Sequence, residues 1–225
     1  MIIQIYSIQT ATEALACVEA GADRIGLLVG RDDGTHFPCE ISEVEAAAIF
    51  NAIGDKATKV LISVQTSESK VLEQTARLRP DVLHLCTGFT GDARFRERLR
   101  ETSPDVCLME AVGMTGPEAV EDALGKAQYA DLLILDSVSS DIAGIGAAGV
   151  THDWALSAEI VRRVDVPVIL AGGLGPENVC AAIRAVRPGG VDSLTRTSVV
   201  ENGVILRKDI ERVRAFCMAV RSLES

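Results

Sequence analysis

The sequence predicts a single-domain α/β fold, a (β/α)8 or TIM barrel that spans residues 1–225. Short apolar runs rich in Val, Ile and Leu alternate with segments of helical periodicity along the chain. The alternation gives eight strand–helix units in 225 residues, which suits a barrel with minimal insertions. A doubly wound open sheet is the alternative arrangement of the same units. No Pro-rich or Ser-rich linker divides the chain, so we expect one domain.

The expected strands are β-branched and aliphatic runs, which are typical of parallel strands that are buried on both faces. They lie at residues 2–6, 24–29, 59–64, 82–85, 106–111, 132–135, 168–171 and 191–194. The segments between them place apolar residues at helical spacing. The expected helices lie at residues 11–19, 42–53, 69–77, 93–102, 117–126, 154–164, 176–186 and 209–223.

Several helix ends carry specific signals. Gly21 follows the end of the first helix. Ser42 and Glu45 form the pattern of a capping box at the start of the second helix. Asp153 precedes the sixth helix, and we expect it to cap that helix. The charged face of the fourth helix is expected to be solvated, and it consists of Arg94, Arg96, Glu97, Arg98, Arg100 and Glu101.

The composition limits the possible partners. Apolar residues make up 48% of the chain, aromatic residues only 4%, and the formal net charge is −10. The negative charge argues against nucleic acid as a partner. An anionic substrate therefore has to be held by local backbone amides or arginines, because the overall field repels it.

The six cysteines show no C-x-x-C spacing of the kind that binds metals. Cys17, Cys180 and Cys217 fall on apolar helix faces, where we expect reduced, buried thiols. The start of the sequence lacks the pattern of a secretion signal, and no apolar run approaches the roughly 18 residues of a membrane span. We expect a cytoplasmic protein without a membrane partner.

Two loops after late strands predict a phosphate site. The stretch VPVILAGGLGPENV, residues 166–179, combines a short strand with Gly172 and Gly173 and then a helix start. Free amides in such a turn hold a phosphate, although a plain tight turn is the alternative. The loop after the eighth strand contributes Thr195 and Arg196. Adjacent loops of this kind near the end of a barrel are a common phosphate site.

The carboxyl ends of other strands supply candidates for chemistry. Asp136 follows a buried apolar strand, where a carboxylate is costly unless it has a function or caps a loop. His84 and Cys86 share one face of their strand and are each either a base or part of the core. Tyr6 and Ser7 end the first strand, where Tyr6 either donates a hydrogen bond to substrate or fills space.

Two further sets are weaker candidates. Glu110 ends its strand and, with His84 and Asp136, forms a set that is able to bind a divalent cation. No short ligand motif supports this, so we expect no metal. Arg31 and His36 lie in the loop after the second strand, where either is a candidate for binding a substrate anion or is simply exposed.

The motifs LLILDS (132–137), GVTHDW (149–154), VPVILAGGLGPENV and GVD (190–192) are similar to those of phosphoribosylanthranilate isomerases. This resemblance covers nearly the full length. It implies a barrel enzyme of tryptophan biosynthesis that catalyses an Amadori rearrangement, an aldose–ketose isomerisation without an organic cofactor. In the family an acid opens the ribose ring and a base removes the C2 proton. The acid is the aspartate of Leu-Asp-Ser, which Asp136 matches.

The sequence departs from the family pattern at several site positions. The family base is the cysteine of Lys-Ile-Cys-Gly, and Tyr6 occupies its place. A phenol has a pKa of about 10 and is a poor base at neutral pH. The family's arginine after the second strand has no counterpart at its place, since Arg31 lies earlier. The Gly-Gly-Thr-Gly loop becomes Gly146-Ala147-Ala148-Gly149, and Ser-Ser-Gly becomes Leu194-Thr195-Arg196.

We therefore expect a divergent member that binds a small phosphorylated sugar or aminosugar. Asp136 is expected to be its acid, with His84, Cys86 and Tyr6 as further catalytic candidates. Gly172, Gly173, Thr195 and Arg196 are expected to bind the phosphate, and Ser7, Arg31, Glu110 and Gly146 the rest of the substrate. The alternatives are a related phosphosugar isomerase, epimerase or lyase, and a barrel that binds a ligand without catalysis. The oligomeric state is expected to be a monomer or a homodimer.

Overall fold

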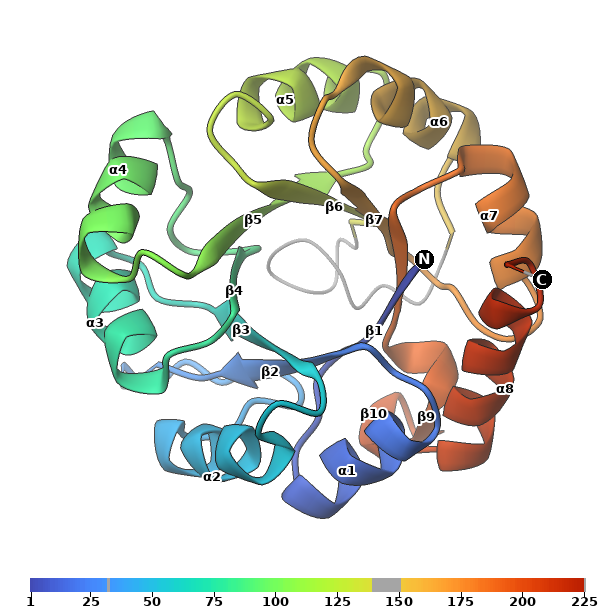
Figure 1. The fold of residues 1–225 in the computed structure, drawn as a ribbon, viewed down its shortest axis with the longest axis horizontal. Coiled ribbons are helices and arrows are strands. Elements are labelled where there is room, and N and C mark those ends of the chain that lie inside the picture. The colour runs from blue at the N-terminus through green and yellow to red at the C-terminus, as the bar shows by residue number, and fades with distance from the viewer. Residues whose placement is uncertain (32, 139–150, 225) are drawn as a thin grey trace.

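The computed structural model of the chain describes residues 1–31, 33–138 and 151–224. Eight parallel strands close into a barrel in sequence order, and helices surround it (Figure 1). The barrel strands are β1 Ile2–Ile5, β2 Arg24–Val29, β3 Thr58–Ser63, β4 Val82–Leu85, β5 Cys107–Gly113, β6 Leu132–Asp136, β7 Val168–Leu170 and β8 Gly190–Ser193. The predicted (β/α)8 barrel is confirmed, and the open sheet is excluded because β1 pairs with β8.

The helices follow the strands one by one. They are α1 Ala11–Glu19, α2 Glu43–Ile53, α3 Glu68–Leu78, α4 Ala93–Thr102, α5 Glu118–Lys126, α6 Trp154–Arg163, α7 Val179–Val186 and α8 Ile210–Arg221. The capping box of Ser42 and Glu45 and the cap by Asp153 are both confirmed. No helix in the described part of the chain is both long and apolar enough to cross a membrane.

Two layers of core follow from the alternation of side chains along each strand. One side of every strand faces the helices and contributes to a large outer core. The other side faces the barrel axis, where an inner cluster includes Ile62, Met109, Ile134 and Ile169. Polar side chains lie among these inner residues near the carboxyl ends of the strands. This alternation therefore decides which residues reach the mouth of the barrel.

Helix α7 begins three residues later than predicted. Residues 176–178 form a turn, and the helix starts at Val179. The Asn178 side chain explains the turn, since it accepts a hydrogen bond from the Gly175 amide at 2.8 Å and donates to the Gly173 carbonyl at 2.9 Å. Pro176 is therefore part of the loop after β7 and not of the helix.

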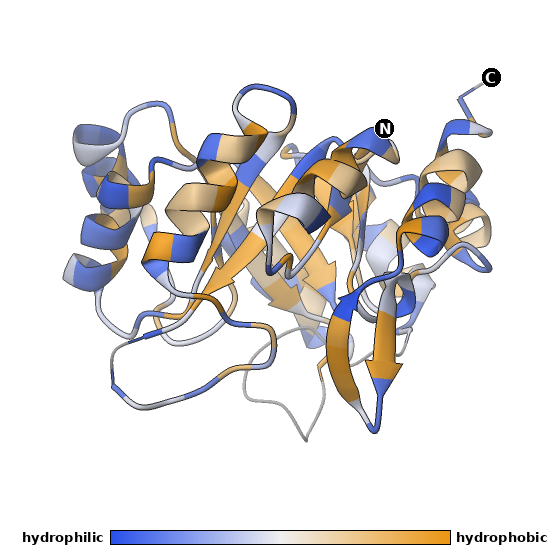
Figure 2. Cartoon of the chain, turned by 90° about the horizontal axis from the view of Figure 1, so that it is seen from below, coloured by the Kyte–Doolittle hydropathy of each residue, from blue (hydrophilic) through white to orange (hydrophobic). Residues whose placement is uncertain are grey.

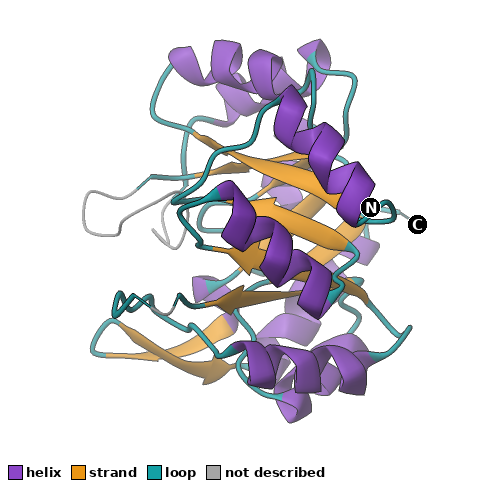
Figure 3. Cartoon of the chain, turned by 90° about the vertical axis from the view of Figure 1, so that its left-hand side faces the viewer, coloured by secondary structure: helices purple, strands orange, loops and turns teal. Residues whose placement is uncertain are grey.

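A β-hairpin between β8 and α8 was not predicted. After a short 3-10 turn, η1 Thr195–Thr197, strand β9 Ser198–Glu201 pairs antiparallel with β10 Val204–Lys208. Asn202 and Gly203 join them with φ values of 50° and 80°, which is the signature of a tight Asn-Gly hairpin turn. The hairpin projects beside the barrel (Figure 2), at the end opposite the two termini (Figure 3).

Aspartates at the amino-terminal end of the barrel cap alternate strands. Asp23 accepts the amide of Ile3 at 2.8 Å, and Asp81 and Asp131 accept the corresponding amides of Lys59 and Leu108, each at 2.7 Å. Each aspartate precedes an even-numbered strand and binds the strand before it. An Ala-Asp or Pro-Asp dipeptide therefore supplies the capping aspartate at each of these three places.

The charged face of α4 is not fully solvated, which corrects the prediction for one of its residues. Arg96 is 7% exposed, and its guanidinium pairs with Asp131 at 2.7 Å. The guanidinium also donates to the Val106 carbonyl at 3.4 Å. The aspartate that caps β5 thus also neutralises a buried cation, which amphipathic spacing alone does not reveal.

Asp131→Ala should lower the free energy of unfolding by about 2–4 kcal/mol, because it leaves Arg96 buried without its partner and the Leu108 amide without an acceptor. Chemical denaturation measures this change. The matched control is Asp105→Ala, since Asp105 is exposed, and it should shift stability by less than about 0.5 kcal/mol. Equal effects of the two substitutions would contradict the assignment.

Candidate active site

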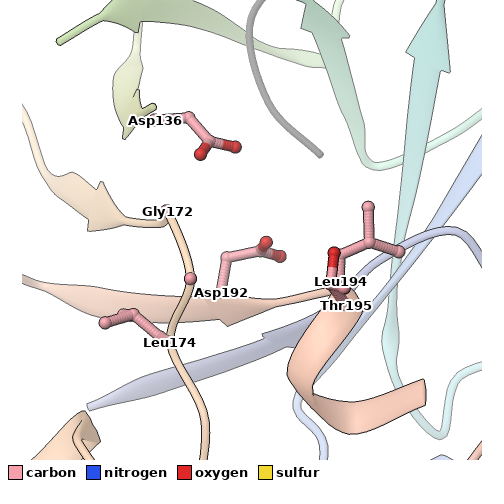
Figure 4. A pocket seen from close by; sticks show the side chains of 7 residues that line it. Asp136, Gly172, Leu174, Asp192, Leu194 and Thr195 are labelled. Carbon is pink, nitrogen blue, oxygen red and sulfur yellow. The ribbon is translucent and has the colours of Figure 1, made fainter. Parts of the chain in front are cut away.

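A pocket opens at the carboxyl ends of β6, β7 and β8. Its volume is about 270 Å³ when the part open to solvent is counted. Residues of strands β6 and β8 and of the loops after β7 and β8 surround it (Figure 4). The lining residues are Asp136, Gly172, Gly173, Leu174, Asp192, Leu194 and Thr195. Four of the predicted site residues therefore meet at one place, which is where a barrel of this kind holds its ligand.

Asp136 is the last residue of β6 and points to the barrel axis. One of its carboxylate oxygens accepts the Ser137 amide at 2.7 Å. Burial raises the pKa of Asp136 to about 7, and the bond from Ser137 opposes that rise. The carboxyl group is thus poised to give or take a proton near neutral pH.

Asp192 is a second carboxyl group in the same pocket, and the sequence analysis overlooked it. It comes from β8, is 4% exposed and accepts a hydrogen bond from the Gln4 side chain at 3.2 Å. Burial raises the pKa of Asp192 well above its usual range, and the neighbouring Asp136 raises it further. Two carboxyls in one pocket do not both ionise easily, so we expect one of the two to be protonated near neutral pH.

The opposite wall of the pocket consists of backbone. Gly172 and Gly173 have φ values of 83° and 59°, a left-handed conformation that glycine adopts without strain. A side chain at Gly172 would also meet the Ser137 hydroxyl and the His152 ring, 2.5 and 2.9 Å from the added Cβ. Successive amides in such a turn form a concave donor site for an anion.

The carbonyls of these loops are tied back by side chains. The Gly173 carbonyl accepts from Asn178, and the Leu174 carbonyl accepts from the Ser193 hydroxyl at 2.7 Å. The C=O and N–H groups of one planar trans peptide point in opposite directions. Fixing the Gly173 carbonyl on Asn178 therefore turns the next amide, that of Leu174, to the other side. This wall therefore presents backbone N–H groups to the pocket, and its carbonyl groups point elsewhere.

Tyr6 fills the barrel interior next to this pocket. Its hydroxyl lies 2.9 Å from His84 Nδ1, and its ring packs over Gly26 so closely that a Cβ at Gly26 would overlap it. Tyr6 is 6% exposed, and burial raises its pKa well above the usual value. The hydroxyl therefore stays protonated and is fixed across the barrel, from the end of β1 to β4.

The environment of His84 and Cys86 disfavours both as bases. Burial lowers the pKa of His84 to about 3, so its ring is neutral at physiological pH, and its buried Nε2 forms no hydrogen bond with a described residue. Burial, assisted by Asp136, raises the pKa of Cys86 to about 12, so the thiol is protonated. Both side chains face the barrel axis as predicted, but neither lines the pocket.

The prediction that Glu110 joins His84 and Asp136 is wrong. Strand alternation turns Glu110 toward the helices, where its carboxylate accepts the Gly91 amide at 3.0 Å. Burial raises its pKa to about 7, opposed first by the charge of Lys126. No group of three or more metal-binding side chains occurs among the described residues. Glu110 therefore ties the loop before α4 to β5 and does not face the pocket.

The remaining candidates lie around the mouth. Ser7 is buried after β1 with a φ of 52°. The Arg31 guanidinium stacks over Phe37 and donates to the Val64 carbonyl at 3.3 Å, apart from the pocket. The Arg196 guanidinium pairs with Glu177 at 2.7 Å and does not line the pocket either. Gly146 lies outside the described residues, so its predicted role remains a prediction.

A histidine bridge beside Gly172 also escaped the sequence analysis. His152 Nδ1 lies 3.1 Å from the Ser137 hydroxyl, and its Nε2 lies 2.8 Å from the Ser157 hydroxyl. Burial lowers the pKa of His152 to about 4, so the ring is neutral. The bridge links Ser137, the residue after Asp136, to Ser157 of α6.

Gly26→Ala should destabilise the protein by about 1–3 kcal/mol, since the new methyl group overlaps the Tyr6 ring. In a Tyr6→Ala background the same substitution should cost little, which gives a coupling of about 1–2 kcal/mol in a double-mutant cycle. The control is Gly125→Ala, because space around this helical glycine is open and alanine favours helix. Additive effects of Gly26→Ala and Tyr6→Ala would refute the packing argument.

Asp136→Asn should stabilise the protein at pH 8, by about 1–3 kcal/mol. The wild-type carboxyl has a higher pKa when folded, about 7, than when unfolded. Its contribution to stability is therefore complete below about pH 4 and is lost as the pH rises through 7. Denaturation curves from pH 4 to 8 should show the difference between variant and wild type growing with pH. A constant difference would contradict the raised pKa.

The chain has relatives of known name along its whole length. The family model for N-(5'phosphoribosyl)anthranilate (PRA) isomerase matches residues 3–219. The N-(5'-phosphoribosyl)anthranilate isomerase of Methanocella arvoryzae is 32% identical over 97% of this chain and 97% of its own. That of Haloferax volcanii is 33% identical over 98% of this chain and 93% of its own.

A solved structure gives the same result. The crystal structure of phosphoribosyl anthranilate isomerase from Thermus thermophilus has a TM-score of 0.78 and 25% identity, and the match covers 99% of this chain and 100% of that one. Fold, length and sequence therefore point the same way, and the similarity predicted from the motifs is confirmed. The chain belongs to the N-(5'-phosphoribosyl)anthranilate isomerase family.

Proposed function

We propose that the protein catalyses the Amadori-type isomerisation of a phosphoribosyl aminosugar, with phosphoribosylanthranilate as the first candidate substrate. The observation that carries this proposal is the pairing of Asp136 and Asp192 in one pocket beside the Gly172–Gly173 turn. An acid and a base are what the reaction needs, and the donor-rich wall suits the phosphate.

The proposed reaction uses one proton donor and one acceptor. The acid protonates the ribose ring oxygen, the bond from that oxygen to C1 breaks, and an iminium forms between C1 and the amine. The base then removes the proton from C2, which gives an enol-amine. This enol-amine becomes the ketone when C1 takes up a proton and the C2 hydroxyl gives up its own. The two carboxyls match this sequence in the state in which one is protonated and the other is ionised.

The resemblance to the family gives the acid role to Asp136, and Asp192 then acts as the base in the state in which Asp136 holds the proton of the pair. Tyr6 occupies the place of the family's cysteine, and its pKa is raised rather than lowered. His84 and Cys86 do not line the pocket, and their shifted pKa values make them weak bases or uncharged thiols at neutral pH. Asp192 is the remaining titratable side chain of the described pocket lining.

The phosphate is proposed to lie against the amides of Gly172, Gly173 and Thr195. Glu177 holds the Arg196 guanidinium away, so any contribution of Arg196 comes from its backbone amide. Arg31 is the candidate for the far end of the substrate, because its side chain crosses from the end of β2 to the end of β3. We also propose a monomer or homodimer in the cytoplasm, a location that fits the six free cysteines.

A second candidate is a different phosphosugar isomerase that does not accept the anthranilate group. The observation that favours it is Tyr6, whose ring and bond to His84 occupy barrel space beside the pocket. A bulkier interior at this point selects against some substrates and for others. A barrel that binds a ligand without catalysis is the third possibility, and the same experiment separates all three.

The test follows the loss of phosphoribosylanthranilate fluorescence with wild type, Asp136→Asn and Asp192→Asn. Each substitution should lower kcat by about 10²- to 10⁴-fold while the fold is retained, because it removes one partner of the proton pair. Asp105→Asn, at an exposed position, is the matched control and should have no effect. The kcat/KM of wild type should peak near neutral pH and fall above it, where the pair loses its shared proton.

The outcomes are distinct. Activity that survives in Asp192→Asn but not in Asp136→Asn would remove Asp192 as the base. An inactive wild type would exclude the named substrate, and ribose 5-phosphate and related aminosugars would then be screened by thermal shift. Binding without turnover in that screen would support the silent barrel.

A further inference from the structure

A buried lysine lies behind one wall of the pocket. Lys208 ends β10 and is 2% exposed. Its Nζ donates to the Leu194 carbonyl at 3.2 Å and to the Ser198 hydroxyl at 2.9 Å. The half-buried Lys126 pairs with Asp122 at 2.7 Å, but among the described residues the ammonium group of Lys208 has no ion-pair partner. Its charge is therefore solvated only by neutral oxygens.

Burying an unpaired cation is costly, and two neutral acceptors offset only part of that cost. The pocket in front of Lys208 contains two carboxyls, and no lysine or arginine belongs to its described lining. With a net charge of −10, the chain also provides no favourable overall field for an anion. A phosphate seated in the pocket would supply the missing countercharge for this lysine.

Lys208 also fixes the direction of a backbone amide. The Leu194 carbonyl accepts bonds from Lys208, from the Ser198 hydroxyl at 2.7 Å and from the Thr197 hydroxyl at 3.2 Å. Since Leu194 lines the pocket and Lys208 does not, this carbonyl points away from the pocket. The amide of Thr195, in the same planar peptide, therefore points toward it. That amide donates to no described residue.

We propose that Lys208 is the positioning residue for the substrate phosphate, acting through its buried charge and through the Leu194–Thr195 peptide that it orients. It selects a dianionic phosphate over a neutral sugar without touching the ligand itself. This inference rests on the proposed function, because it assumes that the phosphate lies at the turn after β8.

The surroundings of Lys208 make its charge sensitive to pH. Burial lowers its pKa to about 8, and Cys17 and Glu13 of α1, Asp192 of β8 and Cys39 oppose that change. The ammonium is therefore charged at pH 7 and becomes neutral as the pH rises past 8. A sugar phosphate is already a dianion throughout this range, since its second pKa is about 6. Its affinity should thus fall together with the charge on Lys208.

The experiment measures the Kd of ribose 5-phosphate by calorimetry at pH 7 and at higher pH, with wild type, Lys208→Met and Lys126→Met. At pH 7, Lys208→Met should weaken binding by roughly ten- to a hundredfold. Lys126→Met also removes a partly buried ammonium that bonds to a carbonyl, but on the outer helix α5, and it should leave the Kd unchanged. The gap between wild type and Lys208→Met should close as the pH rises from 7 to 9.5.

Asp192 is present in both proteins, so its titration affects both curves and the difference between them reports on Lys208. A gap that is absent at pH 7, or constant with pH, would overturn the inference while leaving the proposed function intact. Failure of wild type to bind ribose 5-phosphate at pH 7 would overturn the phosphate site and the inference together. If Lys208→Met does not fold, a wild-type affinity that stays flat across pH 8 would still exclude the role of Lys208.

Discussion

The chemistry of this barrel depends on the alternation of side chains along its parallel strands. Each strand sends one set of residues to the helices and the other to a narrow axis, and a shift by one residue exchanges the two. Asp136 and Asp192 fall on the inner set and share a pocket. Glu110 is also a buried carboxyl with a pKa near 7, but it falls on the outer set and anchors a loop. The position of a carboxyl on its strand, more than its residue type, therefore decides whether it faces the pocket or holds a loop.

The sequence predicts the barrel well because each strand and helix carries a local signal. All barrel strands except β5 and all helices except α7 and α8 lie within one residue of their predicted bounds. The β9–β10 hairpin was not predicted, although Asn202-Gly203 between two short apolar runs is the signal of a tight hairpin turn. Arg96 was missed for another reason. Its partner Asp131 is far away in sequence, and only the closed barrel brings the two together.

The candidate site is predicted only in part. Asp136, the two glycines and Thr195 carry local signals, namely a carboxylate after an apolar strand and a turn before a helix. Asp192 has a similar signal but was passed over, because it lies within its strand and not at the end. The bond between Tyr6 and His84 joins β1 and β4, which are not neighbours in the barrel, so no sequence pattern encodes it. The contact of Lys208 with Leu194 likewise depends on the register of the hairpin.

The register of the β9–β10 hairpin distinguishes a base that is fixed from a tip that tolerates insertions. Ser198 pairs with Lys208 at its base, so the base is fixed to the mouth of the barrel. The tip at Asn202 and Gly203 is exposed, and an added Cβ at Gly203 would meet open space. Residues inserted at the tip therefore leave the register of the base unchanged. Segments inserted at the tip of the hairpin are thus able to reach the rim of the barrel without moving the residues that line the pocket.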